Sequence, residues 1–327
     1  MTDRIVLGLD GGGTSTRAVL ATALGDILGS GRAGPSNYDD VGIAKAGENI
    51  GLAVKQAWTQ AGIAPRPAAA VFLGMAGVVS ASDRSVIHEI AAGLHLADSV
   101  EVDHDLRIAW AGGLALNPGI ALIAGTGSSC YGRTADGSSC RVGGWGHLLD
   151  DGGSSYFLGL EAIRAVVRSV DGRLGSTALL EPILTTLEVQ DAQEIMGRIY
   201  HPPMSRAEIA GLAPLVLKVA QKGDEIAQGI VREGQKELAQ LVSGVAQQLN
   251  FPAGTAQLTV TGGLAQSGDF FKESLYSAIN AQVQGVTIRE PLLSPVLGAV
   301  LLALQLSSES ISEDVISKFK EHELVQE

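Results

Sequence analysis

Cysteine is scarce in this sequence, whose 327 residues contain only Cys130 and Cys140. Two cysteines cannot form the disulfide framework of a small secreted domain, and they cannot supply a zinc site of four thiolates. We therefore expect a protein of a reducing compartment in which both thiols are buried and inert.

Basic residues are few as well. Lys and Arg number 23 against 35 for Asp and Glu, which gives a formal net charge of -12. A protein that holds nucleic acid through its phosphates needs the opposite sign, so the composition argues against a nucleic-acid partner. Any phosphate ligand must instead be held by backbone N–H groups and a metal ion.

Long apolar runs are missing too. The longest late run, residues 296–306, has about half the length of a membrane span. The early run at residues 5–9 follows Asp3 and Arg4, and it is too short and wrongly flanked for a signal peptide. The sequence therefore predicts a cytoplasmic protein with no membrane partner.

Apolar residues and glycine, by contrast, are abundant. Apolar residues make up 46% of the chain and glycine 42 of its 327 residues, which excludes a disordered or fibrous chain. At ~100–200 residues per domain, the length predicts about two domains, each with a sizeable core.

The order of the predicted elements repeats along the chain. Short apolar runs separated by glycines predict a group of hairpin strands, followed by alternating helices and strands. A second strand with a glycine turn and a hairpin begins near residue 120, and helices then dominate to about residue 250. We expect strands at residues 5–9, 17–23, 26–31, 69–73, 100–103, 120–124, 130–133, 141–143, 258–261 and 286–288. We expect helices at residues 41–61, 83–94, 106–115, 270–281 and 295–306, and a loosely docked helix in the tail.

The first glycine turn has the composition of a phosphate-binding loop. A carboxylate at the end of a buried strand precedes three glycines and two threonines, namely Asp10, Gly11, Gly12, Gly13, Thr14 and Thr16. Glycines let the backbone approach a ligand and point N–H groups at it. A dinucleotide site would need glycine at position 16 and a helix after it, and a P-loop would need a Gly-Lys pair, which the chain lacks. A plain glycine hairpin is the structural alternative.

Two later turns share this character. Gly125, Thr126, Gly127 and Ser128 follow the strand expected at 120–124 and again include no basic residue. Gly262 and Gly263 follow the strand expected at 258–261, where α/β folds often bind ligands. Taken singly, these turns could be a β-turn and a helix-entry turn.

The three turns resemble, in order, the first phosphate, second phosphate and adenosine motifs of the actin, Hsp70 and sugar-kinase superfamily. The segment Pro295-Val296-Leu297-Gly298-Ala299 resembles the second connecting motif of the same superfamily. Within it, the chain resembles the BadF/BadG/BcrA/BcrD ATPase family, and in particular its N-acetylglucosamine kinases. The resemblance runs from about residue 5 to residue 304. It implies an α/β protein of two duplicated ribonuclease H-like domains, the actin-like ATPase fold, with an inter-domain cleft. It also implies ATP as cofactor, bound by all three glycine turns.

The same resemblance suggests the domain limits. We expect an N-terminal domain at residues 1–117 and a C-terminal domain at residues 118–327. The second domain would carry a helical insertion at about residues 155–250, and its C-terminal helix would pack back on the first.

Two carboxylates are candidates for the chemistry of phosphoryl transfer. A sugar hydroxyl needs an acceptor for its proton, and the resemblance selects Asp105, just before an alanine-rich helix, over Asp103, which we expect to be structural. The alternative role of Asp105 is a helix N-cap. A carboxylate beside a triphosphate would repel it without an intervening cation, so we assign Asp10 to Mg²⁺, with capping of the turn as its alternative.

The sugar-binding residues are predicted from the resemblance. The loop at residues 143–154 resembles the Gly-Gly-Trp-Gly-His…Gly-Asp-Glu-Gly-Ser motif of the N-acetylglucosamine kinases, with Trp145 and Asp151 as sugar contacts. It departs from the motif in having Asp150 in place of Gly and Gly152 in place of Glu, which leaves the sugar uncertain. Gly127, Asn37 and Asp105 complete the predicted sugar site. The structural alternatives are a core residue for Trp145 and a turn residue for Asn37.

The resemblance therefore implies an ATP-dependent kinase of the 6-hydroxyl of an amino sugar, with N-acetyl-D-glucosamine as the first choice. Glucosamine, N-acetylmuramic acid and glucose are the alternative substrates. A BadF-type regulatory ATPase and a non-catalytic sugar sensor are rivals of another class, although a regulator needs no sugar-binding loop. The partner is a small-molecule sugar, and the sequence leaves a homodimer open.

Overall fold

The computed structural model describes residues 4–252, 254–308 and 311–326. The contacts between Cα atoms divide the chain into two units, Met1–Ala121 with Arg289–Glu327, and Leu122–Ile288. The expected division after residue 117 lies close to the first of these limits. The prediction counted the tail with the second domain but had its C-terminal helix pack back on the first, and the contacts group the tail with the first unit.

The first unit is built on a mixed sheet in the order β3-β2-β1-β4-β5. Strands β1 to β3 are antiparallel neighbours, and β4 and β5 continue the sheet parallel to β1. β1 is buried over most of its length, as expected for an apolar run at the centre of a sheet. The strands are β1 (Ile5–Gly11), β2 (Thr16–Thr22), β3 (Ile27–Ala33), β4 (Ala68–Met75) and β5 (Ala97–His104), at the predicted places.

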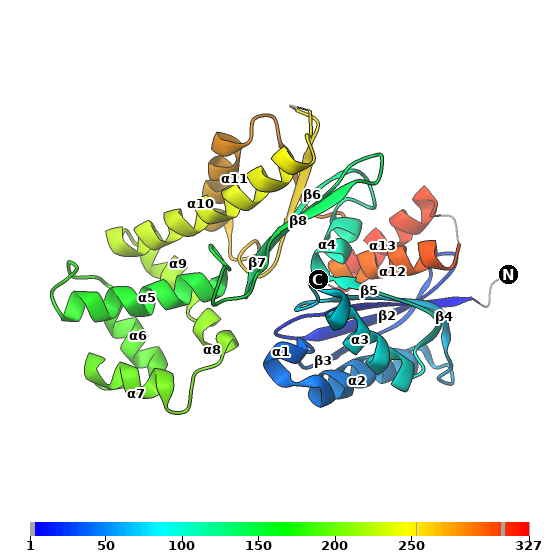
Figure 1. Cartoon of the computed structure of the whole chain (residues 1–327), viewed down its shortest axis with the longest axis horizontal. Helices are drawn as coiled ribbons and strands as arrows, with labels where there is room; N and C mark the ends of the chain where they lie inside the picture. Colours follow the sequence, from blue (N-terminus) through cyan, green and yellow to red (C-terminus); the bar gives the residue numbers. More distant parts are fainter. Residues whose placement is uncertain (1–3, 253, 309–310, 327) are drawn as a thin grey trace. The chain divides into compact units, whose positions relative to one another are not determined.

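Helices cover both faces of this sheet (Figure 1). α2 and α3 lie on one face, and α4, α12 and α13 lie on the other. Leu7, Leu9 and Leu73 of the strands pack with Ile50 and Trp58 of α2 in the core. The helices are α1 (Tyr38–Val41), α2 (Ile43–Ala61), α3 (Ala81–Gly93), α4 (Asp105–Gly113), α12 (Pro295–Leu306) and α13 (Glu313–Gln326).

The tail belongs to the first unit because α12 is part of its core. A Cβ on Gly8 of β1 would lie 2.6 Å from the Val300 nitrogen, so the helix backbone rests directly on the strand. Gly298 is in similar backbone contact with α4, at Ile108. Further along the tail, the Nζ atom of Lys318 in α13 lies 2.8 Å from an Oδ1 atom of Asp26.

The second unit repeats the strand order of the first. Its sheet runs β8-β7-β6-β9-β10, which matches β3-β2-β1-β4-β5 strand for strand. β7 and β8 form an antiparallel hairpin, like β2 and β3. The strands are β6 (Gly119–Ala124), β7 (Ser128–Arg133), β8 (Ser139–Gly143), β9 (Gln257–Thr261) and β10 (Thr287–Arg289). The repeated order confirms the predicted duplicated α/β fold.

Helices occupy most of the chain between β8 and β9. α5 begins where the Ser154 side chain accepts a hydrogen bond from the Phe157 nitrogen, and α10 begins at the equivalent cap of Asp224. The helices are α5 (Ser155–Val170), α6 (Leu180–Leu187), α7 (Ile195–Tyr200), α8 (Arg206–Ala210), α9 (Ala213–Gln221), α10 (Glu225–Gln248) and, after β9, α11 (Asp269–Gln282), with a 3-10 turn at Ala192–Glu194. Over the described residues, we find no helix that combines the length and apolarity of a membrane span.

The two cysteines lie on the β7–β8 hairpin. Cys130 is buried and Cys140 is half-buried, and neither is in a disulfide. Burial raises the pKa of both thiols, which keeps them in the less reactive neutral form.

Candidate functional site

The turn after β1 is held by the loops beside it. The Gly12 nitrogen donates to the Ser15 oxygen at 3.0 Å, and the Gly12 oxygen accepts from the Ser36 and Asn37 nitrogens at 3.1 and 3.3 Å. The Gly11 oxygen accepts from the Ala76 nitrogen at 2.7 Å. The loops that follow β3 and β4 therefore fix this glycine turn at the end of the central strand.

The two threonines of this turn lie differently. Thr14 is exposed, whereas Thr16 is fully buried. The Thr16 hydroxyl donates to the Gly34 oxygen at 2.7 Å and lies 2.8 Å from the Ser36 hydroxyl. Thr16 thus supports the turn through the 34–36 loop, and its own contact with ATP stays a prediction.

Asp10 lies at the carboxyl end of β1 and interacts electrostatically with Asp105. The pKa of Asp10 is raised to about 7 by burial and by the negative charge of Asp105, while Arg17 acts in the opposite direction. Two carboxylates that disfavour each other's ionisation are stabilised by a cation near both.

This donor set fits Mg²⁺. Mg²⁺ binds hard oxygen atoms, and in nucleotide sites it commonly takes one or two carboxylates and completes its shell with phosphate oxygens and water. In the part of the chain that the structure describes, we find no group of three or more His, Cys, Asp or Glu side chains that could hold a metal ion. Asp10, with Asp105 nearby, would therefore hold Mg²⁺ together with the nucleotide rather than in a complete protein site.

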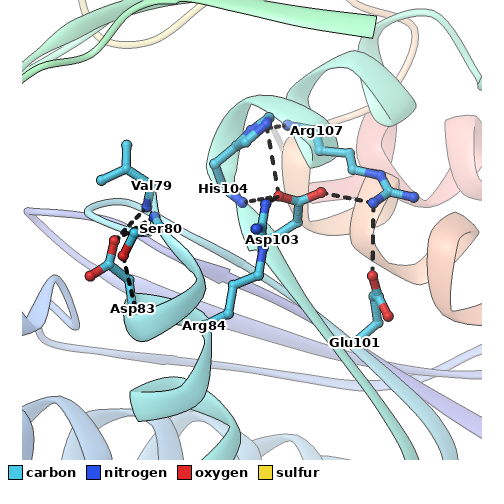
Figure 2. A network of polar contacts seen from close by, with 8 residues as sticks. All are labelled: Val79, Ser80, Asp83, Arg84, Glu101, Asp103, His104 and Arg107. Atoms are coloured by element: carbon cyan, nitrogen blue, oxygen red, sulfur yellow. Dashed lines mark hydrogen bonds and ion pairs between the residues drawn. The ribbon is translucent and has the colours of Figure 1, made fainter. Parts of the chain in front are cut away.

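Asp103, two residues before Asp105, has a structural environment. Figure 2 shows Arg84 of α3 and Arg107 of α4 reaching its carboxylate, at 2.9 and 2.7 Å. Burial opposes the ionisation of Asp103, but His104, Arg107 and Arg84 outweigh it and hold the pKa at about 2. The carboxylate ties α3 and α4 to the end of β5, in agreement with its expected structural role.

The N-cap of α4 is His104. Its Nδ1 atom accepts a hydrogen bond from the Arg107 nitrogen at 3.2 Å. Asp105 is the first residue of the helix, so the alternative in which Asp105 caps it is wrong. An acidic residue in the first turn is also favoured by the helix dipole.

Asn37 is buried and uses both polar atoms of its side chain within the protein. Its Oδ1 atom accepts from the Asp39 nitrogen at 3.3 Å, which caps α1, and its Nδ2 atom donates to Asp40 at 2.8 Å. This is the geometry of the turn-residue alternative. A sugar contact from Asn37 stays a prediction that would add to these bonds or exchange one of them.

In the second unit, the turn after β6 is fixed to the start of α5. The Gly125 oxygen accepts from the Ser155 nitrogen at 2.8 Å, and the Thr126 oxygen accepts from the Tyr156 nitrogen at 3.3 Å. Ser128 is buried, and its hydroxyl donates to the Gly152 oxygen at 2.7 Å. The Ser128 hydroxyl thus holds the loop that contains Asp151. A contact between Ser128 and ATP stays a prediction.

The turn after β9 packs directly on the turn after β6. Gly262 has a φ of 106°, and a Cβ there would lie 2.5 Å from the Ala124 oxygen. The Leu264 nitrogen donates to the same oxygen at 3.0 Å. Only glycine permits both the conformation and the close approach. Two of the three predicted nucleotide motifs therefore meet at one edge of the second sheet.

Asp151 is buried in an ion pair that no local pattern in the sequence indicates. Its Oδ2 atom lies 2.6 Å from a guanidinium nitrogen of Arg206, 55 residues away, and its Oδ1 atom accepts from the Ser128 nitrogen at 3.0 Å. The guanidinium occupies the space that a side chain on Gly127 would need. Burial raises the pKa of Asp151, while Arg206 and the Ser128 N–H lower it and Asp150 raises it.

Trp145 lies on the surface with 68% of its area exposed, so the core alternative is wrong. The guanidinium of Arg141 lies 5.8 Å from its ring centre. Leu148 and Leu149 of the same loop are also exposed, at 85% and 83%. The loop therefore presents apolar surface that the second unit does not bury.

The two sheets have the same strand order, and each has a glycine turn after its central strand. This arrangement defines a duplicated α/β protein of the actin-like ATPase class. The chain belongs to the BadF/BadG/BcrA/BcrD ATPase family, whose model matches residues 7–303.

Three similar proteins cover nearly the whole chain. One is named N-acetylmuramic acid/N-acetylglucosamine kinase of Clostridium acetobutylicum, 31% identical over 92% of this chain and 98% of its own. Another is named N-acetyl-D-glucosamine kinase of Dictyostelium discoideum, 30% identical over 93% and 99%. A crystal structure from Chromobacterium violaceum, described as a candidate N-acetylglucosamine kinase, is 28% identical over 92% and 99%, with a TM-score of 0.77.

Proposed function

We propose that this chain is an ATP-dependent sugar kinase that phosphorylates the 6-hydroxyl of an amino sugar, with N-acetyl-D-glucosamine as its first substrate. The observation that carries the proposal is the end-to-end similarity to two kinases named for N-acetylglucosamine, at 31% and 30% identity. N-acetylmuramic acid is the second candidate substrate, because it appears in the name of the Clostridium relative.

The nucleotide is held mainly by backbone groups. We assign Gly11, Gly12, Gly13 and Thr14 to phosphate in the first unit. In the second unit, Gly125 to Gly127 take phosphate, and Gly262 and Gly263 take the adenosine. Such turns can hold phosphate without a basic residue, provided that a metal ion neutralises the remaining charge. Mg²⁺ at Asp10 would supply that neutralisation.

Asp105 is the proposed general base. It accepts the proton of the sugar hydroxyl as the oxygen attacks the γ-phosphorus of ATP and the bond to the β-phosphate oxygen breaks. Asp103 cannot take this role without breaking its pairs with Arg84 and Arg107. The pairing of Asp103 supports the choice of Asp105.

The sugar contacts proposed for the second unit are Gly127, Trp145 and Asp151. Each carboxylate oxygen of Asp151 has one partner among the residues that the structure describes and can accept a further hydrogen bond from a sugar hydroxyl. The exposed ring of Trp145 offers an apolar face to a pyranose. Asn37 in the first unit is the remaining proposed contact. A cytoplasmic location and a homodimer also stay predictions.

A panel of sugars tests this function. ATP consumption is measured with N-acetylglucosamine, N-acetylmuramic acid, glucosamine and glucose, and without sugar. We expect the highest kcat/KM for N-acetylglucosamine and little turnover without sugar. ATP hydrolysis that no sugar stimulates would favour the regulatory ATPase instead.

A further inference from the structure

Helix α10 packs along the loop that contains Asp151. Gly153 has a φ of 77°, and a Cβ there would collide with the Gly234 backbone of α10. Further along the same face of the helix, a Cβ on Gly143 would lie 2.7 Å from Leu241. Residues 234, 237 and 241 share this face because they are spaced by three and four positions. α10 is therefore fixed against the loop on both sides of position 237.

Glu237 occupies the space beside Gly152. A Cβ on Gly152 would lie 3.0 Å from the Cβ, the Cγ and the Oε2 atom of Glu237. Gly152 is not among the residues with a positive φ, so its backbone does not require glycine. What a side chain at position 152 would displace is the Glu237 side chain. The glycine that interrupts the Asp-Glu-Gly-Ser motif thus makes room for a glutamate from another element.

The Glu237 carboxylate has no hydrogen bond or ion pair with any other residue that the structure describes, although the side chain is half-buried. The other glutamate one turn earlier, Glu233, is exposed and pairs with Lys236 at 3.2 Å. The acceptor positions of this half-buried carboxylate are therefore open to water or to the hydroxyl groups of a ligand.

From this placement, we propose that Glu237 binds a hydroxyl group of the sugar substrate and replaces the carboxylate that position 152 has lost. The proposal rests on the sugar-kinase function proposed above. A carboxylate is an acceptor for hydroxyl hydrogens, and this one is positioned by the packing of Gly153 against Gly234 rather than by a flexible loop.

Glu237→Ala and Glu237→Gln are compared with the wild type in sugar and ATP kinetics. Removing an acceptor for a sugar hydroxyl should raise the sugar KM by about ten- to a hundredfold. The KM for ATP and the circular dichroism spectrum should stay unchanged. Glu233→Gln on the same helix is the control and should retain wild-type sugar affinity.

A swap of the two positions separates ligand binding from a packing role. Gly152→Glu alone should weaken sugar binding, because the new side chain meets Glu237. The double variant Gly152→Glu with Glu237→Ala restores one carboxylate at the loop, and its sugar KM should return to within about threefold of the wild type. A packing role for Glu237 predicts no such rescue.

An unchanged sugar KM in both Glu237 variants, or no rescue in the double variant, would overturn this proposal. These outcomes bear on Glu237 when the wild type phosphorylates a sugar. If it phosphorylates none, the kinase function itself is wrong, which is a different failure.

Discussion

Replacing Asp10 by Asn should make the ligand-free first unit more stable at alkaline pH while abolishing phosphoryl transfer. The pKa of Asp10 is raised from 3.8 to about 7, by burial and by the charge of Asp105. An acid with a raised pKa in the fold stabilises it below the unfolded pKa, and this contribution is lost as the pH rises toward the folded pKa. The wild type therefore loses stability between about pH 4 and pH 7, whereas the Asp10→Asn variant does not lose this contribution.

The size of the effect follows from the shift. One pKa unit corresponds to about 1.4 kcal/mol, so the two units between pH 5 and a pKa of about 7 give an upper limit of about 2.7 kcal/mol. Asp10 is only half-buried, and solvent screens part of this cost. We expect the stability gap between Asp10→Asn and the wild type to widen by about 1–2 kcal/mol from pH 5 to pH 8.

Urea unfolding followed by tryptophan fluorescence measures this gap. Trp58 and Trp110 are buried in the first unit, so in a Trp145→Phe background the signal reports on that unit alone. Asp98→Asn, which changes an exposed carboxylate on β5, is the control for the loss of one negative charge in the same unit. A gap for Asp10→Asn that is the same at pH 5 and pH 8 would refute the reasoning about Asp10 and Asp105.

Three further variants test the other carboxylates. Asp105→Asn should lower kcat by at least ~10²-fold while ATP still binds, as expected for a general base, and unimpaired turnover would remove Asp105 from this role. Asp103→Asn should instead lower stability by about 1–3 kcal/mol, because asparagine removes the negative charge that pairs with Arg84 and Arg107. A specific loss of kcat in a protein of wild-type stability would show that Asp103 is the base. Asp151→Ala should cost ~1–3 kcal/mol of sugar binding in calorimetry, and wild-type affinity would exclude Asp151 from the sugar site.

The sequence was sufficient for the elements and the repeated fold, because these depend on local patterns. The run from Ile5 to Leu9 is apolar, and Asp10 and three glycines follow it, so a buried strand and a turn are predicted together. A second strand and glycine turn near residue 120 predict the duplication that the two strand orders show. The packing of the tail on the first unit is implied by the family resemblance alone, because no local pattern connects α12 with β1 and α4.

The direction in which a side chain points could not be predicted from the turns. Thr16 and Ser128 have the residue types of phosphate-binding loops, yet their hydroxyls bond to the backbone of neighbouring loops. Arg206 and Glu237 reach the Asp151 loop from distant helices, and no spacing in the sequence connects them to it. Gly152 was the one available signal, since a glycine in place of the motif's glutamate indicates that space is needed there.

The most direct test of this account is the product of the reaction itself. Purified protein is incubated with ATP, Mg²⁺ and N-acetylglucosamine, and phosphorus NMR follows the fate of the γ-phosphate. We expect N-acetylglucosamine 6-phosphate in an amount equal to the ADP formed, with none from Asp105→Asn or in excess chelator. Release of inorganic phosphate from ATP with no sugar phosphate would contradict the sugar-kinase function.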